Sequence, residues 1–232
     1  MARTRGAPHP QLRRERYGDP AHRESKGIMR EPLADVARTA LQQGGPTTAQ
    51  ATADHLTVPA DTPLIADVWI NGDIGFVLLL HRRNDGLVAE ELYYSVRRED
   101  GAWERPDHLS GGIVGMEVAD SAAVEDALAG APMSVVAESE SLVHTGRDPN
   151  GDDGEPVRIS ELLVSSEVNL IEIERLSPAS PETSAPFERR VTGPLMLLVL
   201  LPGERIRVSA MRGEGSSRTR LGNALELHNP EP

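Results

Sequence analysis

Apolar residues alternate with polar ones, or form short continuous runs, between residues 64 and 105. Each run ends at a tight-turn dipeptide: Asn71-Gly72, Asp85-Gly86 or Asp100-Gly101. Asn-Gly and Asp-Gly supply the positive φ angles that two-residue hairpin turns require. The pattern therefore predicts a four-stranded antiparallel β-meander. Its expected strands span 64–70, 74–82, 87–98 and 102–105.

The faces of these strands follow from the alternation. The second strand is apolar on both faces, which is typical of a central strand. In the first strand the residues expected to share a face are Leu64, Ala66, Val68 and Ile70. In the third strand Val88, Leu92 and Tyr94 share a face, and the opposite face holds Glu91, Tyr93, Ser95 and Arg97. We expect that second, more polar face to lie toward solvent.

The second half of the chain is also strand-like, with one short helix expected at 120–129 between Asp120 and Gly130. The fold class predicted is mainly β: an antiparallel β-sandwich built on the β-meander (64–105), with one N-terminal helix and one short crossover helix. An α+β fold is the alternative. The further strands that we expect lie near 112–118, 133–137 together with 142–143 as one strand, 157–164, 168–176, 188–191, 195–201, 205–211 and 221–227.

Three regions follow from the pattern. Residues 1–31 are rich in Arg, Pro, Gly and His without a hydrophobic period, so we expect a disordered basic arm; Met29 is an alternative start. Residues 32–62 are predicted to form a helix, Pro32–Gln43, and an extended linker. The mainly-β domain is expected at 63–228. The helix places Leu33, Val36, Ala37, Ala40 and Leu41 on one apolar face.

The distribution of charge along the chain limits the classes of partner that we expect. Residues 1–30 hold eight basic and three acidic side chains, a net charge of +5, and the rest of the chain has a net charge of −17. An acidic body repels polyanions, so nucleic acid is an unlikely partner for it. No apolar run reaches the roughly 20 residues of a membrane helix, so we expect no membrane association.

The composition also bears on the cell and on cofactors. Cysteine is absent, which excludes disulfides and thiolate sites. Arginine far outnumbers lysine, which is represented by Lys26 alone; this is typical of a GC-rich bacterial genome. We expect a bacterial cytoplasmic protein without a cofactor.

One loop has the composition of a cation site. Asp148, Asn150 and Asp152 follow the i, i+2, i+4 spacing of calcium loops, which use hard oxygen ligands. The EF-hand pattern then fails, because Asp153 stands where glycine is needed and Ile159 where glutamate is needed. A solvated hairpin loop is the alternative interpretation.

Catalytic signals are weak. Ser110-Gly111-Gly112 is similar to a hydrolase nucleophile turn, and His81 and Asp107 are available to complete a triad, but the Gly-x-Ser-x-Gly motif is absent. Glu90 stands on the apolar face of its strand, where burial would raise its pKa. The sequence leaves the question of an enzyme open and favours a non-catalytic role.

The partner site that we predict from the sequence consists of Tyr93, Arg97 and Trp103. Aromatic and arginine side chains are enriched among interface anchors. The function expected is a non-catalytic protein-interaction or scaffold module that binds another protein or self-associates. The alternatives are a loop-based β-sandwich that binds calcium or carbohydrate, and a hydrolase of unmarked type.

Overall fold

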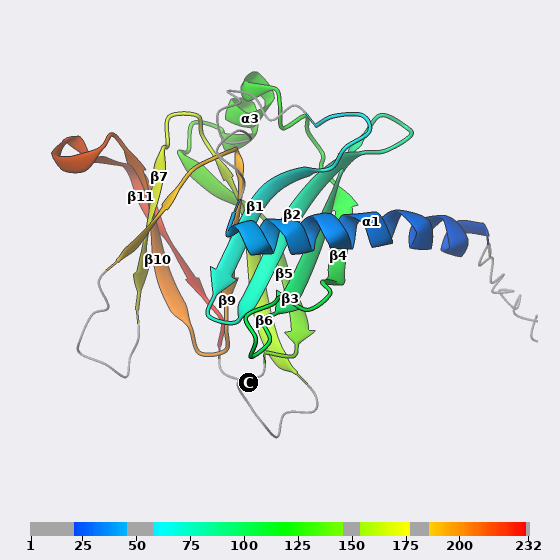
Figure 1. Ribbon diagram of the computed structural model, residues 1–232. Helices are drawn as coiled ribbons and strands as arrows, with labels where there is room; N and C mark the ends of the chain where they lie inside the picture. The colour runs from blue at the N-terminus through cyan, green and yellow to red at the C-terminus, as the bar shows by residue number, and fades with distance from the viewer. Residues whose placement is uncertain (1–20, 46–57, 146–153, 177–185, 231–232) are drawn as a thin grey trace, which may run out of the picture.

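The computed structural model describes residues 21–45, 58–145, 154–176 and 186–230. It is a mainly-β protein with three antiparallel sheets in a sandwich-like arrangement, as predicted (Figure 1). In the described part of the chain, no helix is both long and apolar enough to cross a membrane.

The first sheet, the meander sheet, has its strands in sequence order. They are β1 (Leu64–Asn71), β2 (Ile74–Arg82), β3 (Val88–Val96) and β4 (Asp107–Ile113). Gly72, Gly86 and Gly101 all have positive φ angles, as the turn signals predict. The first three strands are therefore confirmed.

The fourth strand differs from the prediction. Residues 102–105 form only an isolated bridge, between Arg97 and Trp103. The chain then passes Pro106, and β4 pairs with β3 instead. The strand expected near 112–118 is also wrong, because β4 ends at Ile113. Glycines disfavour strands in general, yet Gly111 and Gly112 lie within β4.

Two further sheets complete the fold. The β6 sheet has the order β5 (Met133–Val143), β6 (Glu155–Val164), β9 (Leu195–Leu200). The β10 sheet has the order β11 (Thr219–His228), β10 (Arg205–Arg212), β7 (Leu170–Arg175), β8 (Phe187–Arg190). Helix α3 (Ser121–Leu128) is capped by the side chain of Asp120, as predicted. A 3-10 turn, η1 (Gly215–Ser217), precedes β11.

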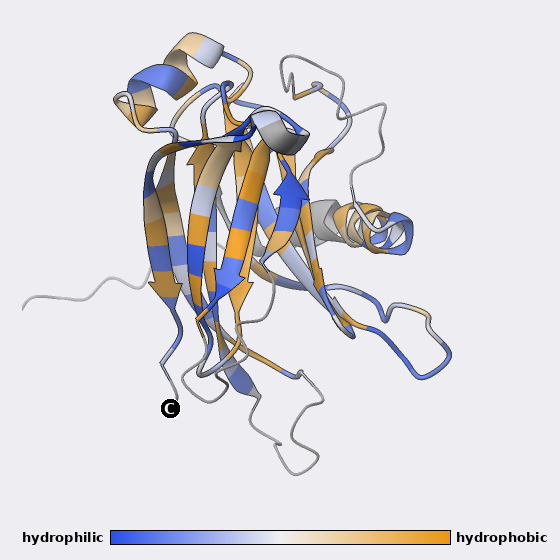
Figure 2. Cartoon of the chain, turned by 90° about the vertical axis from the view of Figure 1, so that its left-hand side faces the viewer, coloured by the Kyte–Doolittle hydropathy of each residue, from blue (hydrophilic) through white to orange (hydrophobic). Residues whose placement is uncertain are grey.

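The apolar residues form two cores. The main core lies between the three sheets and includes Phe76, Leu78, Leu162 and Ile173. Figure 2 shows the corresponding alternation of hydrophobic and hydrophilic bands along the strands. The second core lies between the other face of the meander sheet and α1 (Ala21–Gln43), which crosses that face (Figure 1).

Helix α1 uses the apolar face that the sequence predicts. Leu33, Ala37, Ala40 and Leu41 are buried against the sheet. A Cβ atom at Gly75 of β2 would lie 2.4 Å from the Cδ2 atom of Leu41, so the helix packs closely on the strand. The helix begins at Ala21 rather than at Pro32. Proline favours the first helical turn, but here it lies inside the helix; residues 1–20 are outside the described residues.

A β-bulge changes the faces of β1. The pairing of β1 with β2 shifts register between Ile65 and Asp67. As a result Ala66 faces the main core whereas Val68 faces α1, so the shared face expected for these two residues is wrong. An extra residue at a bulge redirects the side chains that follow it. Asp67 is consequently buried, at 4% exposure.

Candidate functional site

An ion pair connects the three sheets next to the bulge. Arg189 of β8 donates through Nη2 to Oδ1 of Asp67 at 2.7 Å and to the carbonyl oxygen of Val68 at 3.0 Å. The backbone N–H of Leu197 in β9 donates to Oδ2 of Asp67 at 2.6 Å. Arg189 also donates through Nη1 to the carbonyl oxygen of Leu197 at 2.7 Å. One carboxylate and one guanidinium thus satisfy both backbone groups of Leu197.

Trp69 and Phe187 pack beside this ion pair. The guanidinium of Arg189 lies 4.9 Å from the Trp69 ring centroid, and the Trp69 and Phe187 rings meet edge to face at 6.1 Å. These contacts fix the aromatic side chains at the end of the main core, where β1 approaches β8. Such aromatic and cation–π contacts contribute about 0.5–2 kcal/mol each.

A groove of about 480 Å³ opens at this place. We call it the Trp69 groove. Its walls include Trp69 and Asn71 of β1, Arg175 of β7, Phe187 and Arg189 of β8, and Gly44 after α1. β1 and β8 are edge strands of their sheets. The Nε1 atom of Trp69 is buried and has no hydrogen-bond partner among the described residues.

Arg175 differs from the other arginines around it. It is the last residue of β7, it is exposed, and its guanidinium lies 5.5 Å from the Phe187 ring centroid. Within the described residues it forms no ion pair. Arg175 follows Ile171 and Ile173 at alternate positions, so it extends the inward-facing row of β7 beyond the core.

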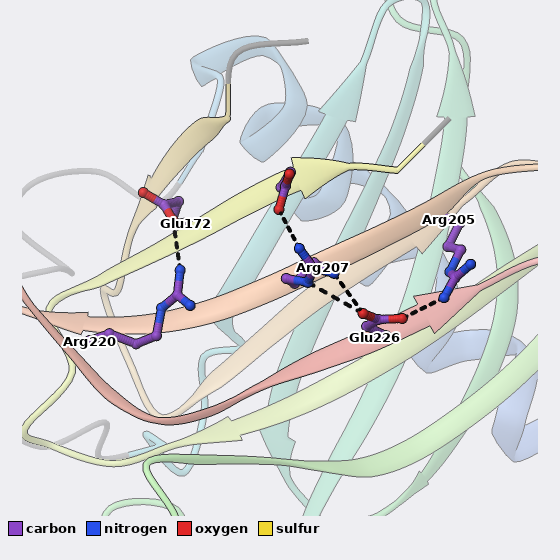
Figure 3. Close-up of polar contacts among 6 residues, drawn as sticks. Glu172, Arg205, Arg207, Arg220 and Glu226 are labelled. Carbon is purple, nitrogen blue, oxygen red and sulfur yellow. Dashed lines mark hydrogen bonds and ion pairs between the residues drawn. The ribbon is translucent and has the colours of Figure 1, made fainter. Parts of the chain in front are cut away.

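The solvent face of the β10 sheet, in contrast, is a paired network (Figure 3). Arg207 lies 3.0 Å from Glu174 and 2.9 Å from Glu226, which are its direct register partners on the two neighbouring strands. Hydrogen bonds from Arg205 and Arg207 lower the pKa of Glu226. Arg220 and Glu172 form a further pair at 3.6 Å. Each of the arginines labelled in Figure 3 thus has a carboxylate partner.

The partner surface predicted from the sequence is not where we expected it. Tyr93 is 1% exposed and Trp103 is 6% exposed, because α1 covers this face of the meander sheet. The prediction that Tyr93 lies toward solvent is therefore wrong. The guanidinium of Arg97 does lie 4.5 Å from the Trp103 ring centroid, so these two residues of the predicted site are in contact. With its aromatic members in the core, this surface loses its support as a docking site.

Glu91 lies between two histidines on the α1 side of the meander sheet. Nε2 of His108 lies 2.5 Å from Oε2 of Glu91, and Nε2 of His81 lies 3.4 Å from Oε1. Burial alone would raise the pKa of Glu91, but the hydrogen bonds from His81 and His108 outweigh it and lower the pKa. Gly111 stands opposite Glu91 in the pairing with β4, where a Cβ atom would lie 2.4 Å from Oε2.

Glu90 points to the other face of β3 and meets Glu161 of β6. Glu161 is 8% exposed; burial, followed by the charge and hydrogen bond of Glu90, raises its pKa to about 8. Glu90 does lie on the apolar face of β3, as the sequence predicts, and it is half-buried there. The strongly shifted group, however, is its partner on another sheet.

The described residues bring together neither a Ser-His-Asp triad nor a metal-binding cluster. The described residues contain no hydrogen bond between any two of Ser110, His81 and Asp107, and His81 faces Glu91 instead. They also contain no group of three His, Asp or Glu side chains placed to hold a metal ion. The loop with Asp148, Asn150 and Asp152 lies outside the described residues.

The sequence interpretation missed the residues of the Trp69 groove. One signal was present: Arg175 occupies an inward-facing position in the alternation of β7. Trp69 and Phe187 come together only in three dimensions. A scan against protein-family models gave no match, and searches of curated proteins and of solved structures gave none either.

Proposed function

We propose that this chain is a non-catalytic protein-interaction module, and that the Trp69 groove holds a segment of its partner. The observation that carries the proposal is the exposed Arg175, which stacks on Phe187 beside Trp69 and lacks an ion-pair partner among the described residues. Tryptophan and arginine are the residue types most enriched at interface hot spots.

The two walls of the groove support an extended segment as the occupant. Among the described strands, β1 pairs only with β2, and β8 pairs only with β7. Each therefore presents an edge whose backbone groups no other described strand takes up, although the side chain of Arg189 already binds the carbonyl oxygen of Val68. Extended peptides bind such edges through main-chain hydrogen bonds, and adjacent pockets select their side chains.

The remaining polar clusters support a structural role better than catalysis. Asp67 and Arg189 satisfy each other, and Glu91 is held by His81 and His108. The arginine-rich, lysine-poor composition supports a bacterial source, and we place the module in the cytoplasm as part of this proposal.

A peptide-display selection tests the proposal. A library of random peptides is selected on the full chain, on Asn71→Trp, which fills the rim of the groove, and on Glu140→Trp, a matched change on the exposed face of β5. We expect peptides that bind the unchanged chain and Glu140→Trp but not Asn71→Trp. If no peptide depends on the groove, the proposal is wrong. Thermal unfolding confirms that both variants fold.

A further inference from the structure

Building on the proposed function, we propose that the partner segment carries a carboxylate side chain, and that Arg175 binds this carboxylate against the face of Phe187. The acidic residue of the segment would enter beside an apolar one, because Arg175 and Trp69 line the same groove.

The first argument is the contrast among the arginines of the β10 sheet. Every other arginine in its four strands has a carboxylate oxygen within 3.7 Å. These residues are Arg189, Arg190, Arg205, Arg207, Arg212 and Arg220. Arg175 is the exception among the described residues, so its guanidinium is available to bind a carboxylate of the partner.

The second argument is geometric. The Arg175 guanidinium lies over the Phe187 ring, with Cζ 5.5 Å from the ring centroid, and its N–H donors bind no carboxylate among the described residues. A planar guanidinium held in this way is suited to bind a carboxylate through two parallel hydrogen bonds. Arg189 is not available for this purpose, because its Nη1 and Nη2 atoms already donate to Asp67, Val68 and Leu197.

The third argument concerns the neighbouring indole. Trp69 is 6% exposed, and its Nε1 donor is without a partner among the described residues. A buried donor that stays unpaired carries a free-energy cost. An acceptor oxygen of the bound segment, reaching this donor, would remove that cost. The groove therefore combines a guanidinium that lacks an ion-pair partner among the described residues with aromatic walls, one of which holds a buried indole N–H that is unpaired there.

Net charge selects a protein over a nucleic acid as the source of the anion. The chain has a formal net charge of −12, which repels a phosphodiester backbone with its many charges. A single carboxylate in an otherwise uncharged segment meets little of this repulsion, because a Debye length of about 8 Å screens distant charges at physiological salt.

The test compares peptides selected on three proteins: the full chain, Arg175→Gln, and Arg220→Gln as the matched control. Arg220 lies in the same sheet, is exposed, and is paired with Glu172. We expect Asp or Glu at a fixed position in peptides selected on the full chain and on Arg220→Gln, and no such preference on Arg175→Gln. Replacing that acidic residue by its amide should weaken binding roughly tenfold, which corresponds to about 1.4 kcal/mol.

The outcomes separate this inference from the proposed function. Peptides that depend on the groove but show no acidic preference would overturn the inference and leave the docking function standing. An acidic preference that persists on Arg175→Gln would overturn the role of Arg175. If free N-acetylglutamate displaces a selected peptide at an equal concentration, the site is one for small carboxylates and the inference is wrong.

Discussion

Arg189 on β8 donates a 2.7 Å hydrogen bond to Asp67 on β1, although the two residues are 122 positions apart in the sequence. Because the same carboxylate accepts from the backbone of Leu197 on β9, one ion pair joins all three sheets. It also fixes Arg189 against Trp69. The shape of the Trp69 groove therefore depends on a contact between distant parts of the chain.

Replacement of Asp67 by Ala should lower the free energy of unfolding by about 3–5 kcal/mol, because it leaves a largely buried guanidinium without its partner. Chemical denaturation measures this change. Asp35 provides the control, since its ion pair with Arg38 is exposed and such pairs contribute about 0–1 kcal/mol. Equal losses for Asp67→Ala and Asp35→Ala would contradict the structural role of the buried pair.

Gly111→Ala should destabilise the protein by about 1–3 kcal/mol, the usual cost of overpacking. The new Cβ atom would lie 2.4 Å from Oε2 of Glu91 and 3.0 Å from the backbone oxygen of Glu90. Gly115→Ala is the matched control, because nothing lies within 4 Å of a Cβ atom there. Thermal unfolding of the two variants distinguishes them, and a neutral Gly111→Ala would show that β4 does not approach β3 in this way.

Stability should fall as the pH rises from about 4.5 to about 8. The pKa of Glu161 is about 8 in the folded protein, against an ordinary value of 4.5. Between these values the folded state keeps a proton that the unfolded state has lost. The slope reaches at most about 1.4 kcal/mol per pH unit, and the stabilisation is complete below the lower value.

Glu161→Gln removes this titration while keeping the size of the side chain. Urea unfolding across the same pH range should therefore give a flatter profile for the variant, with its largest gain over the unchanged chain above pH 8. Identical profiles for the two proteins would mean that Glu161 ionises as an ordinary surface carboxyl group does.

Tyr93→Ala should lower the free energy of unfolding. Tyr93 is fully buried beneath α1, and removal of a large aromatic side chain from a core costs about 3–5 kcal/mol. Leu87→Ala is a control at an exposed position, where changes stay within about 0.5 kcal/mol. A fully stable Tyr93→Ala protein would return this residue to consideration as a surface contact.

The sequence predicts the first three strands of the meander well because the information for them is local. Gly72, Gly86 and Gly101 each fix a turn, and the strands between them need only their own alternation. The face of Tyr93 was assigned correctly as the one opposite Leu92. The exposure of Tyr93 was not predicted correctly, because α1 covers that face. The residue pattern of β3 gives no information about a helix that packs on it from a distant part of the sequence.

The candidate site could not be predicted for a related reason. A one-residue bulge at Ala66 turns Asp67 inward, and the hydrophobic alternation of the sequence does not predict this bulge. The groove then requires Trp69 and Phe187, from different sheets, to meet edge to face. The one feature of the site that the sequence does show is Arg175, a charged residue at a position of β7 where the alternation predicts an apolar one.

Photo-crosslinking from the rim of the Trp69 groove tests the central claim most directly. The small diazirine amino acid photo-leucine, which is close to Asn in size and leaves the groove open, is placed at position 71, and at position 140 as a control, and each protein is irradiated with a peptide selected on the unchanged chain. The account predicts a crosslink from position 71 whose yield Arg175→Gln lowers, and none from position 140. Crosslinks from position 140, or none from position 71, would contradict docking in this groove.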